Sequence, residues 1–298
     1  MQISAGSTRI EIDDQGPTSA DPLLLIMGLS LQLTAWPEAL VQLLLVRGFR
    51  VIRMDNRDSG LSQGFDHLGA PNLGWASLRY LLHMKVPTPY VLADMAADAL
   101  GVLDALGLPR AHVCGASLGG MVAQHMAAGQ PQRLASLTLM MTTAGARHAP
   151  KPAMRALAAL LSRPASVASA DVVAHLERVL AVIGSPAFPP DACLQSRHLH
   201  DMMTRAPWRP AGTARQLAAV LADGDRTPML ARIKAPTCVI YGRSDPLIRV
   251  AAGVDLSRQI EGATADLVEG MGHDLPAVLL ARFADTIRAN ADRASHVN

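Results

Sequence analysis

The stretch Gly115-Ala116-Ser117-Leu118-Gly119-Gly120 decides how the rest of the chain is interpreted. It fits the pattern Gly-x-Ser-x-Gly, it follows the apolar run Ala111–Cys114, and it precedes a helical pattern that starts at Met121. A serine on a sharp turn from strand to helix exposes its hydroxyl, and flanking glycines let neighbouring backbone approach closely. The start of the helix also directs free N–H groups at the reacting centre. This context favours Ser117 as a nucleophile over a serine that only caps a helix.

A serine nucleophile needs a base, and the base needs a group that orients it. Among ten histidines, His273 is distinctive because it lies in a glycine-rich loop between an apolar run and the last predicted helix. Loops at the carboxyl ends of strands are where α/β sheets place their sites. We therefore predict that His273 is the base.

The orienting acid is expected between Ser117 and His273 in the chain, at the end of a strand. Asp245 directly follows the apolar run Thr237–Tyr241, whereas the competing carboxylates lie in a helical stretch or beyond Asp245. The alternative interpretation of Asp245 is a turn aspartate before a proline, which is a common pairing. We predict Asp245 as the third member of the triad.

An oxyanion intermediate needs two backbone N–H donors. Leu118 follows the nucleophile directly and supplies the first predicted donor. The second is expected in the loop after the apolar run Leu23–Met27, where Gly28 permits a tight bend and Leu29 follows it. The predicted oxyanion hole therefore consists of the amides of Leu29 and Leu118.

Composition excludes several classes of function. Of 298 residues 50% are hydrophobic, and 27 basic against 25 acidic residues leave a net charge of only +2, so no nucleic-acid partner is expected. No apolar run reaches the roughly 18 residues of a membrane span, and no signal peptide is apparent, so we expect a cytoplasmic protein. Three cysteines without a Cys-x-x-Cys pair argue against a disulfide framework and a zinc cluster.

Strand and helix patterns alternate along most of the chain, which predicts a mostly parallel sheet covered on both faces. The alternation breaks in a stretch rich in Ala, Leu, Arg and Pro that has helical periodicity and no strand pattern. We predict a core of residues 1–145 and 233–298, with residues 146–232 forming a helical cap. The predicted strands are Leu23–Met27, Arg50–Met54, Ala111–Cys114, Leu134–Met140, Thr237–Tyr241 and Thr264–Val268. The predicted helices are Trp36–Arg47, Val91–Leu106, Met121–Ala128, Val172–Ile183, Thr213–Leu221 and Leu275–Ala289.

The chain resembles the α/β-hydrolase superfamily in five segments that occur in the family's order. They are residues 25–28, 55–62, 115–120, 242–245 and 270–273. Within the superfamily it is most similar to the carboxylesterases that resemble aclacinomycin methylesterase, as Trp36-Pro37 and the Arg-Asp-Ser-Gly-Leu-Ser stretch at 57–62 indicate. The resemblance implies an α/β-hydrolase fold with an eight-stranded, mostly parallel sheet and a helical cap inserted between strands 6 and 7.

The resemblance also implies roles for residues that could be misjudged. Asp55, Arg57 and Asp58 look like a catalytic cluster, but in the family this loop is scaffold. Many relatives carry histidine where this chain has Met27, and the resemblance implies a largely structural role for that histidine. The triad is therefore expected to work without it.

These observations predict a serine hydrolase that cleaves a small-molecule carboxylic ester through an acyl-enzyme, without a metal or an organic cofactor. The cap is expected to form a lid over Ser117, and its Leu, Ala and Met content suggests an apolar pocket. Cofactor-free haloperoxidases or perhydrolases, lactonases and carbon–carbon bond hydrolases share the triad and stay open as alternatives. A non-catalytic binding protein on the same fold is the alternative from a different class.

Overall fold

The computed structural model describes residues 1–146 and 148–296, and residues 147, 297 and 298 lie outside the described part of the chain. The described residues include an eight-stranded sheet with the order β1-β2-β4-β3-β5-β6-β7-β8. The strands β1 and β2 pair antiparallel with each other, β2 pairs antiparallel with β4, and the remaining pairs are parallel. The bounds of the strands are β1 Gln2–Ala5, β2 Thr8–Gln15, β3 Asp21–Ile26, β4 Phe49–Met54, β5 Ala111–Ala116, β6 Leu134–Met140, β7 Thr237–Gly242 and β8 Thr264–Val268.

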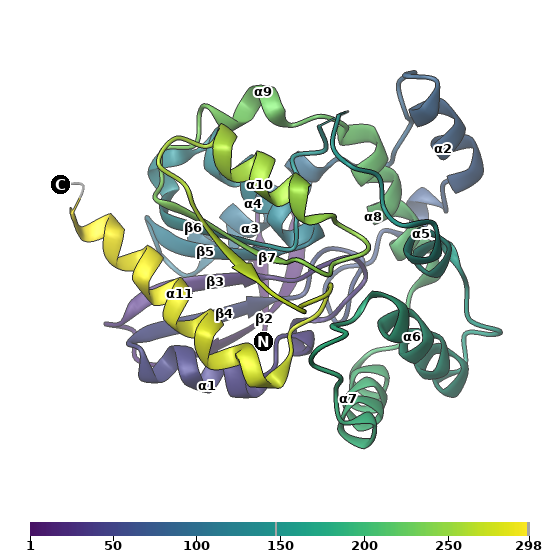
Figure 1. Cartoon of the computed structure of the whole chain (residues 1–298), viewed down its shortest axis with the longest axis horizontal. Coiled ribbons are helices and arrows are strands. Elements are labelled where there is room, and N and C mark those ends of the chain that lie inside the picture. Colours follow the sequence, from purple (N-terminus) through teal and green to yellow (C-terminus); the bar gives the residue numbers. More distant parts are fainter. Residues whose placement is uncertain (147, 297–298) are drawn as a thin grey trace.

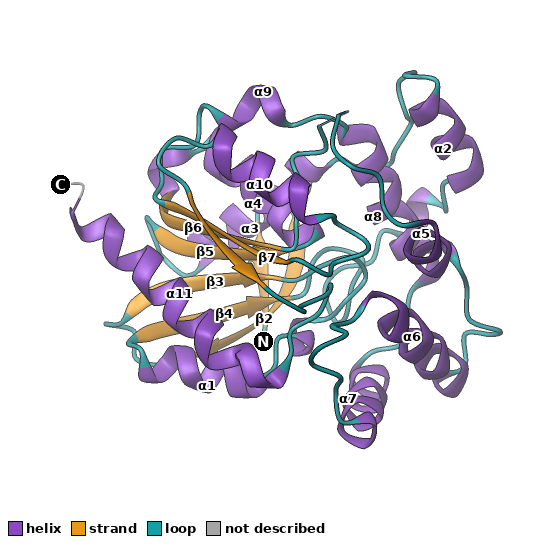
Figure 2. Cartoon of the chain, in the orientation of Figure 1, coloured by secondary structure: helices purple, strands orange, loops and turns teal. Residues whose placement is uncertain are grey.

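Helices cover both faces of the sheet and its carboxyl edge (Figures 1 and 2). One face carries α3, α4 and α10, and the other carries α1 and α11. The helices α5–α8 lie beyond the carboxyl ends of the strands, on the right in Figure 1. The bounds are α1 Glu38–Val46, α2 Leu73–Leu81, α3 Leu92–Ala105, α4 Leu118–Gly129, α5 Met154–Leu161, α6 Ser169–Ile183, α7 Ala192–Arg205, α8 Pro210–Asp223, α9 Thr227–Leu230, α10 Val250–Gln259 and α11 Leu280–Asp292.

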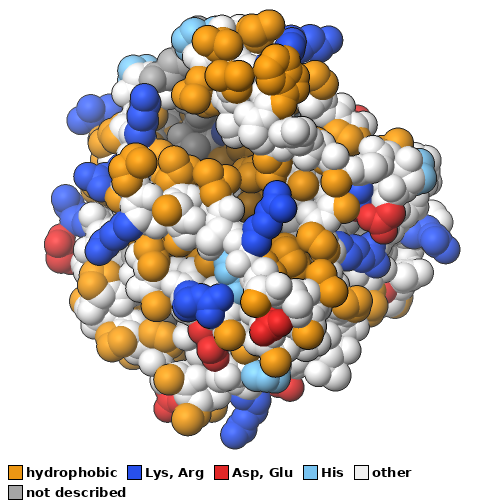
Figure 3. Space-filling model, turned by 90° about the vertical axis from the view of Figure 1, so that its right-hand side faces the viewer, with side chains coloured by type: hydrophobic (Ala, Val, Ile, Leu, Met, Phe, Trp, Pro, Cys, Tyr) orange, Lys and Arg blue, Asp and Glu red, His pale blue; other side chains and the backbone are white. Residues whose placement is uncertain are grey.

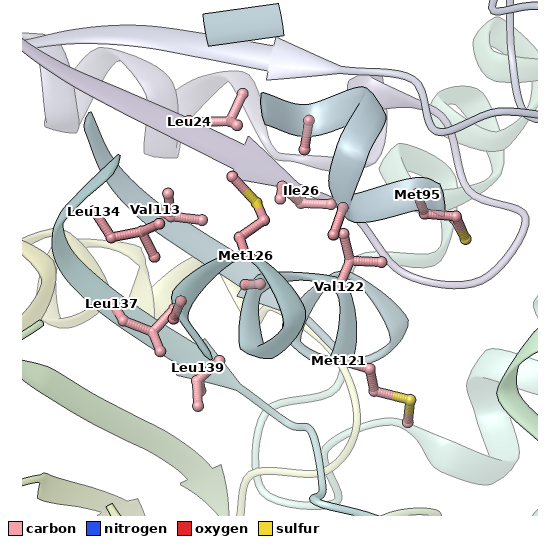
Figure 4. Close-up of a cluster of buried hydrophobic side chains, with 14 of the residues drawn as sticks. Leu24, Ile26, Met95, Val113, Met121, Val122, Met126, Leu134, Leu137 and Leu139 are labelled. Atoms are coloured by element: carbon pink, nitrogen blue, oxygen red, sulfur yellow. The ribbon is translucent and has the colours of Figure 1, made fainter. Parts of the chain in front are cut away.

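The alternation of side chains along the central strands builds two hydrophobic cores. In β3, Leu24 and Ile26 face the core under α3 and α4, while Leu23 and Leu25 face the core under α1 and α11. Figure 4 shows the first of these, where strand side chains meet those of α4 such as Val122 and Met126. Full burial of each such side chain contributes about 1.5–3 kcal/mol. The two cores fix the sheet rigidly beneath the loops at its carboxyl edge.

The order of the strands creates a topological switch point at that edge. The strand β4, which follows β3 in the chain, lies on one side of β3, and the next strand in the chain, β5, lies on the other side. Loops at the carboxyl ends of neighbouring strands separate at such a switch point, and ligands of open α/β sheets bind there. Ser117 follows β5 and the predicted oxyanion loop follows β3, so both flank the switch point.

The sequence predicted the central strands well and the periphery less well. All six predicted strands are present within one or two residues of their expected bounds, whereas β1, β2 and the helices α2, α5, α7, α9 and α10 were not predicted individually. The helix predicted at Leu275–Ala289 begins only at Leu280. The reason is Pro276, which has an extended backbone and disfavours a helical conformation for the residue before it.

The predicted helical insertion lies between β6 and β7, as α5–α9. Of these, α9 packs against α4 and α10 on the body of the molecule, whereas α5, α6 and α7 form a connected group. The precise division at residues 146 and 232 stays a prediction. Among the described residues, no helix is long and apolar enough to cross a membrane.

Candidate active site

Ser117 is the single residue between the end of β5 and the start of α4. Its backbone has φ 53° and ψ −117°, a strained conformation for a residue with a side chain. The strain is held by hydrogen bonds: its N–H donates to the Met140 carbonyl at 2.8 Å, and its own carbonyl accepts from the Thr142 hydroxyl at 2.7 Å. The hydroxyl is thereby presented at the end of β5, above the switch point.

The glycines around Ser117 are required by close backbone contacts. A Cβ atom at Gly115 would overlap the carbonyl of Gly119, and one at Gly119 would overlap the carbonyl of Ile26 in β3. The steric explanation that the sequence suggested for the Gly-x-Ser-x-Gly pattern therefore matches the geometry. The serine turn and the loop after β3 can touch only because these side chains are absent.

The structure brings Ser117, His273 and Asp245 together from three different strand ends. His273 follows β8 and Asp245 follows β7. The Nε2 atom of His273 lies 3.1 Å from the hydroxyl of Ser117, and its Nδ1 atom lies 2.7 Å from Oδ2 of Asp245. The three side chains form a continuous hydrogen-bonded chain.

The environment of Asp245 fixes the direction of that chain. Its side chain is buried, and its Oδ1 atom accepts hydrogen bonds from the amides of Leu247 at 2.8 Å and Ile248 at 2.9 Å. Oδ2 is thus left to accept the Nδ1–H of His273. With the proton on Nδ1, the Nε2 atom is free to accept the hydroxyl proton of Ser117.

The segments that carry the predicted oxyanion donors, Leu29 and Leu118, lie next to Ser117. Leu118 is the first residue of α4, and a Cβ atom at Gly28 would be 3.3 Å from the Cβ of Ser117, so the loop after β3 passes next to the serine. Within the part of the chain that the structure describes, neither amide donates to a protein acceptor. Both N–H groups are therefore available to a ligand near Ser117.

The helices α7 and α8 are tied to the loops after β3 and β4 by buried charged and polar contacts, which we call the arginine junction. Arg215 of α8 donates to Asp58 through two nitrogens, at 2.7 and 2.8 Å, and both side chains are fully buried. Arg205 of α7 donates to Asp55 at 2.8 Å. Asp55, Arg57 and Asp58 thus make structural contacts, Arg57 through a buried pair with Asp98. Among the hydrogen bonds and ion pairs of the described residues, none joins these three side chains to Ser117 or His273.

The end of α6 is tied to the loop that carries His273 by a second set of contacts, which we call the histidine-loop junction. It joins residues 183–187 to residues 270–274. In it the side chain of Ser185 contacts Asp274, the residue next to His273. Sequence reasoning singled out neither Asp274 nor Ser185 as part of the site.

Among the described residues, no group of three or more His, Cys, Asp or Glu side chains is placed to hold a metal ion. The surface near the insertion is hollowed, and hydrophobic side chains gather around the hollow (Figure 3). Exposed apolar residues include Trp75, Leu78 and Leu81 of α2 and Met154 and Leu161 of α5.

The sequence matches one family model over most of its length. Residues 21–276 match the model of the alpha/beta hydrolase fold, and the chain belongs to this family. It is 29% identical to rhodomycin D methylesterase DauP of Streptomyces sp. (strain C5), with 94% of each protein covered. It is also 29% identical to rhodomycin D methylesterase DnrP of Streptomyces peucetius, again over 94% of each.

Solved structures support the same assignment of the fold. A hydrolase from Pseudomonas aeruginosa PA01 superposes with a TM-score of 0.67 at 27% identity, covering 99% of this chain and 97% of the other. The enol-lactonase from Burkholderia xenovorans LB400 has a TM-score of 0.71 at 22% identity over 99% of this chain and 100% of the other. The second likeness concerns the fold alone.

Proposed function

We propose that this protein is a serine hydrolase of carboxylic esters in which Ser117, His273 and Asp245 form the catalytic triad. One observation carries the proposal: the hydrogen-bonded chain from the Ser117 hydroxyl through the imidazole of His273 to the buried carboxylate of Asp245. A hydroxyl is a weak nucleophile until a positioned base takes its proton, and this arrangement supplies that base.

In the proposed reaction, the Oγ atom of Ser117 attacks the ester carbonyl carbon while its proton moves to Nε2 of His273. The carbonyl oxygen becomes an oxyanion, which the amides of Leu29 and Leu118 stabilise; one such donor is typically worth about 10²–10³ in kcat. The imidazolium is stabilised by Asp245. The imidazolium of His273 then gives its proton to the departing alcohol, and the acyl group stays bound to Ser117 as an acyl-enzyme.

Water completes the cycle by the same proton path. It attacks the acyl carbon while His273 accepts its proton, and the proton then returns to Ser117 as the carboxylic acid leaves. Every atom and proton is accounted for by ester and water alone. No further group is needed for the cycle.

Two observations support the proposed substrate class. Relatives at 29% identity are methylesterases, which supports a small alkyl ester as the scissile group. The helix α2, which packs against α8 of the insertion, and the helix α5 expose several apolar side chains, and these support a substrate whose remainder is bulky and hydrophobic. We propose that residues 146–232 act as a lid that contributes to this selectivity.

The test is kinetic and uses a panel of methyl esters, aryl esters, p-nitrophenyl esters and lactones. Ser117→Ala, His273→Ala and Asp245→Asn are each expected to lower kcat by about 10⁴-fold or more, while the proteins stay folded. A Ser117→Ala variant that retains more than about a tenth of the activity would refute the nucleophile. If lactones are turned over far better than open-chain esters, the lactonase alternative replaces the ester hydrolase; a lactone hydrolase is among the relatives, at 29% identity.

A further inference from the structure

Several hydrogen bonds join the loop that carries His273 to residues of the insertion. The backbone N–H of His273 itself donates to the carbonyl of Ile183 at 2.7 Å. The preceding N–H, of Gly272, donates to the hydroxyl of Ser185 at 2.8 Å. Farther along, the N–H of Ala187 donates to the carbonyl of Gly270 at 3.2 Å. The base of the proposed triad is thus held in place by a segment more than 80 residues away in sequence.

The two segments lie so close that only glycine fits at their contact. A Cβ atom at Gly272 would overlap the carbonyl oxygens of Gly184 and Ile183. A Cβ atom at Gly270 would overlap the side chain of Ala187. Because backbone packs on backbone, a shift of the end of α6 displaces the histidine loop.

Ser185 and Asp274 form the side-chain part of this contact. The Ser185 hydroxyl donates to Oδ1 of Asp274, and the Ser185 N–H donates to Oδ2 at 3.2 Å. The same hydroxyl accepts from Gly272, so it links both residues that flank His273. Burial raises the pKa of Asp274, and the hydrogen bonds from Ser185 oppose that rise.

We propose that Ser185 and Asp274 are positioning residues that hold the imidazole of His273 within reach of Ser117. The insertion then does more than act as the proposed lid, because its residues 183–187 also support the loop that carries the base. This inference rests on the proposed triad, and it adds two residues that touch neither the hydroxyl of Ser117 nor the ring of His273 through a hydrogen bond. It predicts that the rate of the chemical step depends on how the end of α6 packs against the histidine loop.

The test compares Ser185→Ala and Asp274→Asn with a matched control in the same insertion. The hydroxyl of Ser166 also donates a hydrogen bond to an aspartate, Asp171, at 2.5 Å, but this pair is exposed and lies at the start of α6, whereas the histidine loop contacts its end. All variants are compared at equal concentrations of folded protein, which thermal unfolding verifies. If Ser185→Ala does not fold, Asp274→Asn carries the test, because it keeps the size of the side chain.

Two readouts separate positioning from a general structural role. Displacement of a base by about 1 Å can cost 10²-fold, so kcat of Ser185→Ala is expected to fall by about ten- to a hundredfold, with KM within about twofold. The rate at which a small fluorophosphonate modifies Ser117 should fall by a similar factor, because that reaction needs His273 but not the substrate pocket. Ser166→Ala should leave both rates unchanged.

The double variant adds a third readout. Since both side chains act through one contact, Ser185→Ala combined with Asp274→Asn should lose no more activity than the stronger single variant. If folded Ser185→Ala and Asp274→Asn keep the kcat and the modification rate of the wild type, the inference is wrong. It is also wrong if the two substitutions change only KM and leave kcat unchanged. Inactivity of Ser117→Ala and His273→Ala in the same experiments would show that the triad itself stands.

Discussion

Two of the junctions between the insertion and the body of the molecule are chemically different. At the arginine junction, two aspartates of the body pair with Arg205 and Arg215, and the Arg215–Asp58 pair is fully buried. At the histidine-loop junction, backbone amides and one serine hydroxyl make the contacts, and no lysine or arginine of the described residues pairs with Asp274. The first junction depends on charge, and the second depends on the close approach of backbone.

This difference indicates a division of roles. A buried ion pair is costly to break but tolerates small displacements, since its energy changes slowly with distance. Backbone hydrogen bonds next to a catalytic residue transmit displacements of a fraction of an ångström directly to the reacting atoms. We therefore expect changes at the arginine junction to act mainly on stability and changes at the histidine-loop junction to act mainly on kcat.

The largest effect on stability is expected from Arg215→Met. The change leaves the Asp58 carboxylate buried without its cation, and the free energy of unfolding should fall by about 3–5 kcal/mol. Denaturation in urea measures it. The control is Arg47→Met, which breaks a pair whose partner Asp285 is 69% exposed, and which should cost less than about 1 kcal/mol. If the free energy of unfolding falls equally in the two variants, the buried pair stabilises the fold no more than the exposed pair, contrary to the prediction.

A smaller loss of stability, with a marked loss of activity, is expected from Gly272→Ala. The new methyl group must push the end of α6 away from the histidine loop, at a cost of about 1–3 kcal/mol. The accompanying displacement of His273 should lower kcat by about tenfold or more. In the control Gly129→Ala the new Cβ meets nothing within 4 Å at the end of α4, so activity should not change. If Gly272→Ala loses stability but keeps its kcat, the two junctions do not differ as proposed.

The smallest effect, and the sharpest contrast, lies in the pH dependence of stability. Burial raises the pKa of Asp58, but hydrogen bonds from Arg215, the Phe65 amide and Tyr90 outweigh it, so the folded-state pKa is lowered. This carboxylate stabilises the fold above about pH 4 and loses that effect as the pH falls through its folded-state pKa. Asp274 has a raised pKa instead, mainly from burial, so its contribution is present below about pH 4 and is lost as the pH rises through its folded-state pKa.

Urea denaturation of Asp58→Asn and Asp274→Asn between about pH 3 and 7 tests this contrast. The stability of the wild type relative to Asp58→Asn should increase with pH. Its stability relative to Asp274→Asn should decrease with pH. Slopes of the same sign would show that the two aspartates share one kind of environment, contrary to their different partners.

The comparison also explains what the sequence could predict. Ser117, Asp245 and His273 each lie within a few residues after an apolar strand pattern and carry a local turn signal, so sequence alone could nominate them. The alternation of Ile10 and Ile12 is a sequence signal for β2. By contrast, Ser185 and Asp274 are 89 residues apart, and Asp58 and Arg215 are 157 apart. Such pairs have no characteristic spacing, and only the three-dimensional packing brings them together.

The central claim is that the hydroxyl of Ser117 is the nucleophile activated by His273. The most direct measurement is the mass of the intact protein after reaction with a small fluorophosphonate, followed by mapping of the modified residue. We predict a single adduct on Ser117, formed rapidly in the wild type, very slowly in His273→Ala and not at all in Ser117→Ala. An adduct on another residue, or equally fast labelling of His273→Ala, would contradict the account.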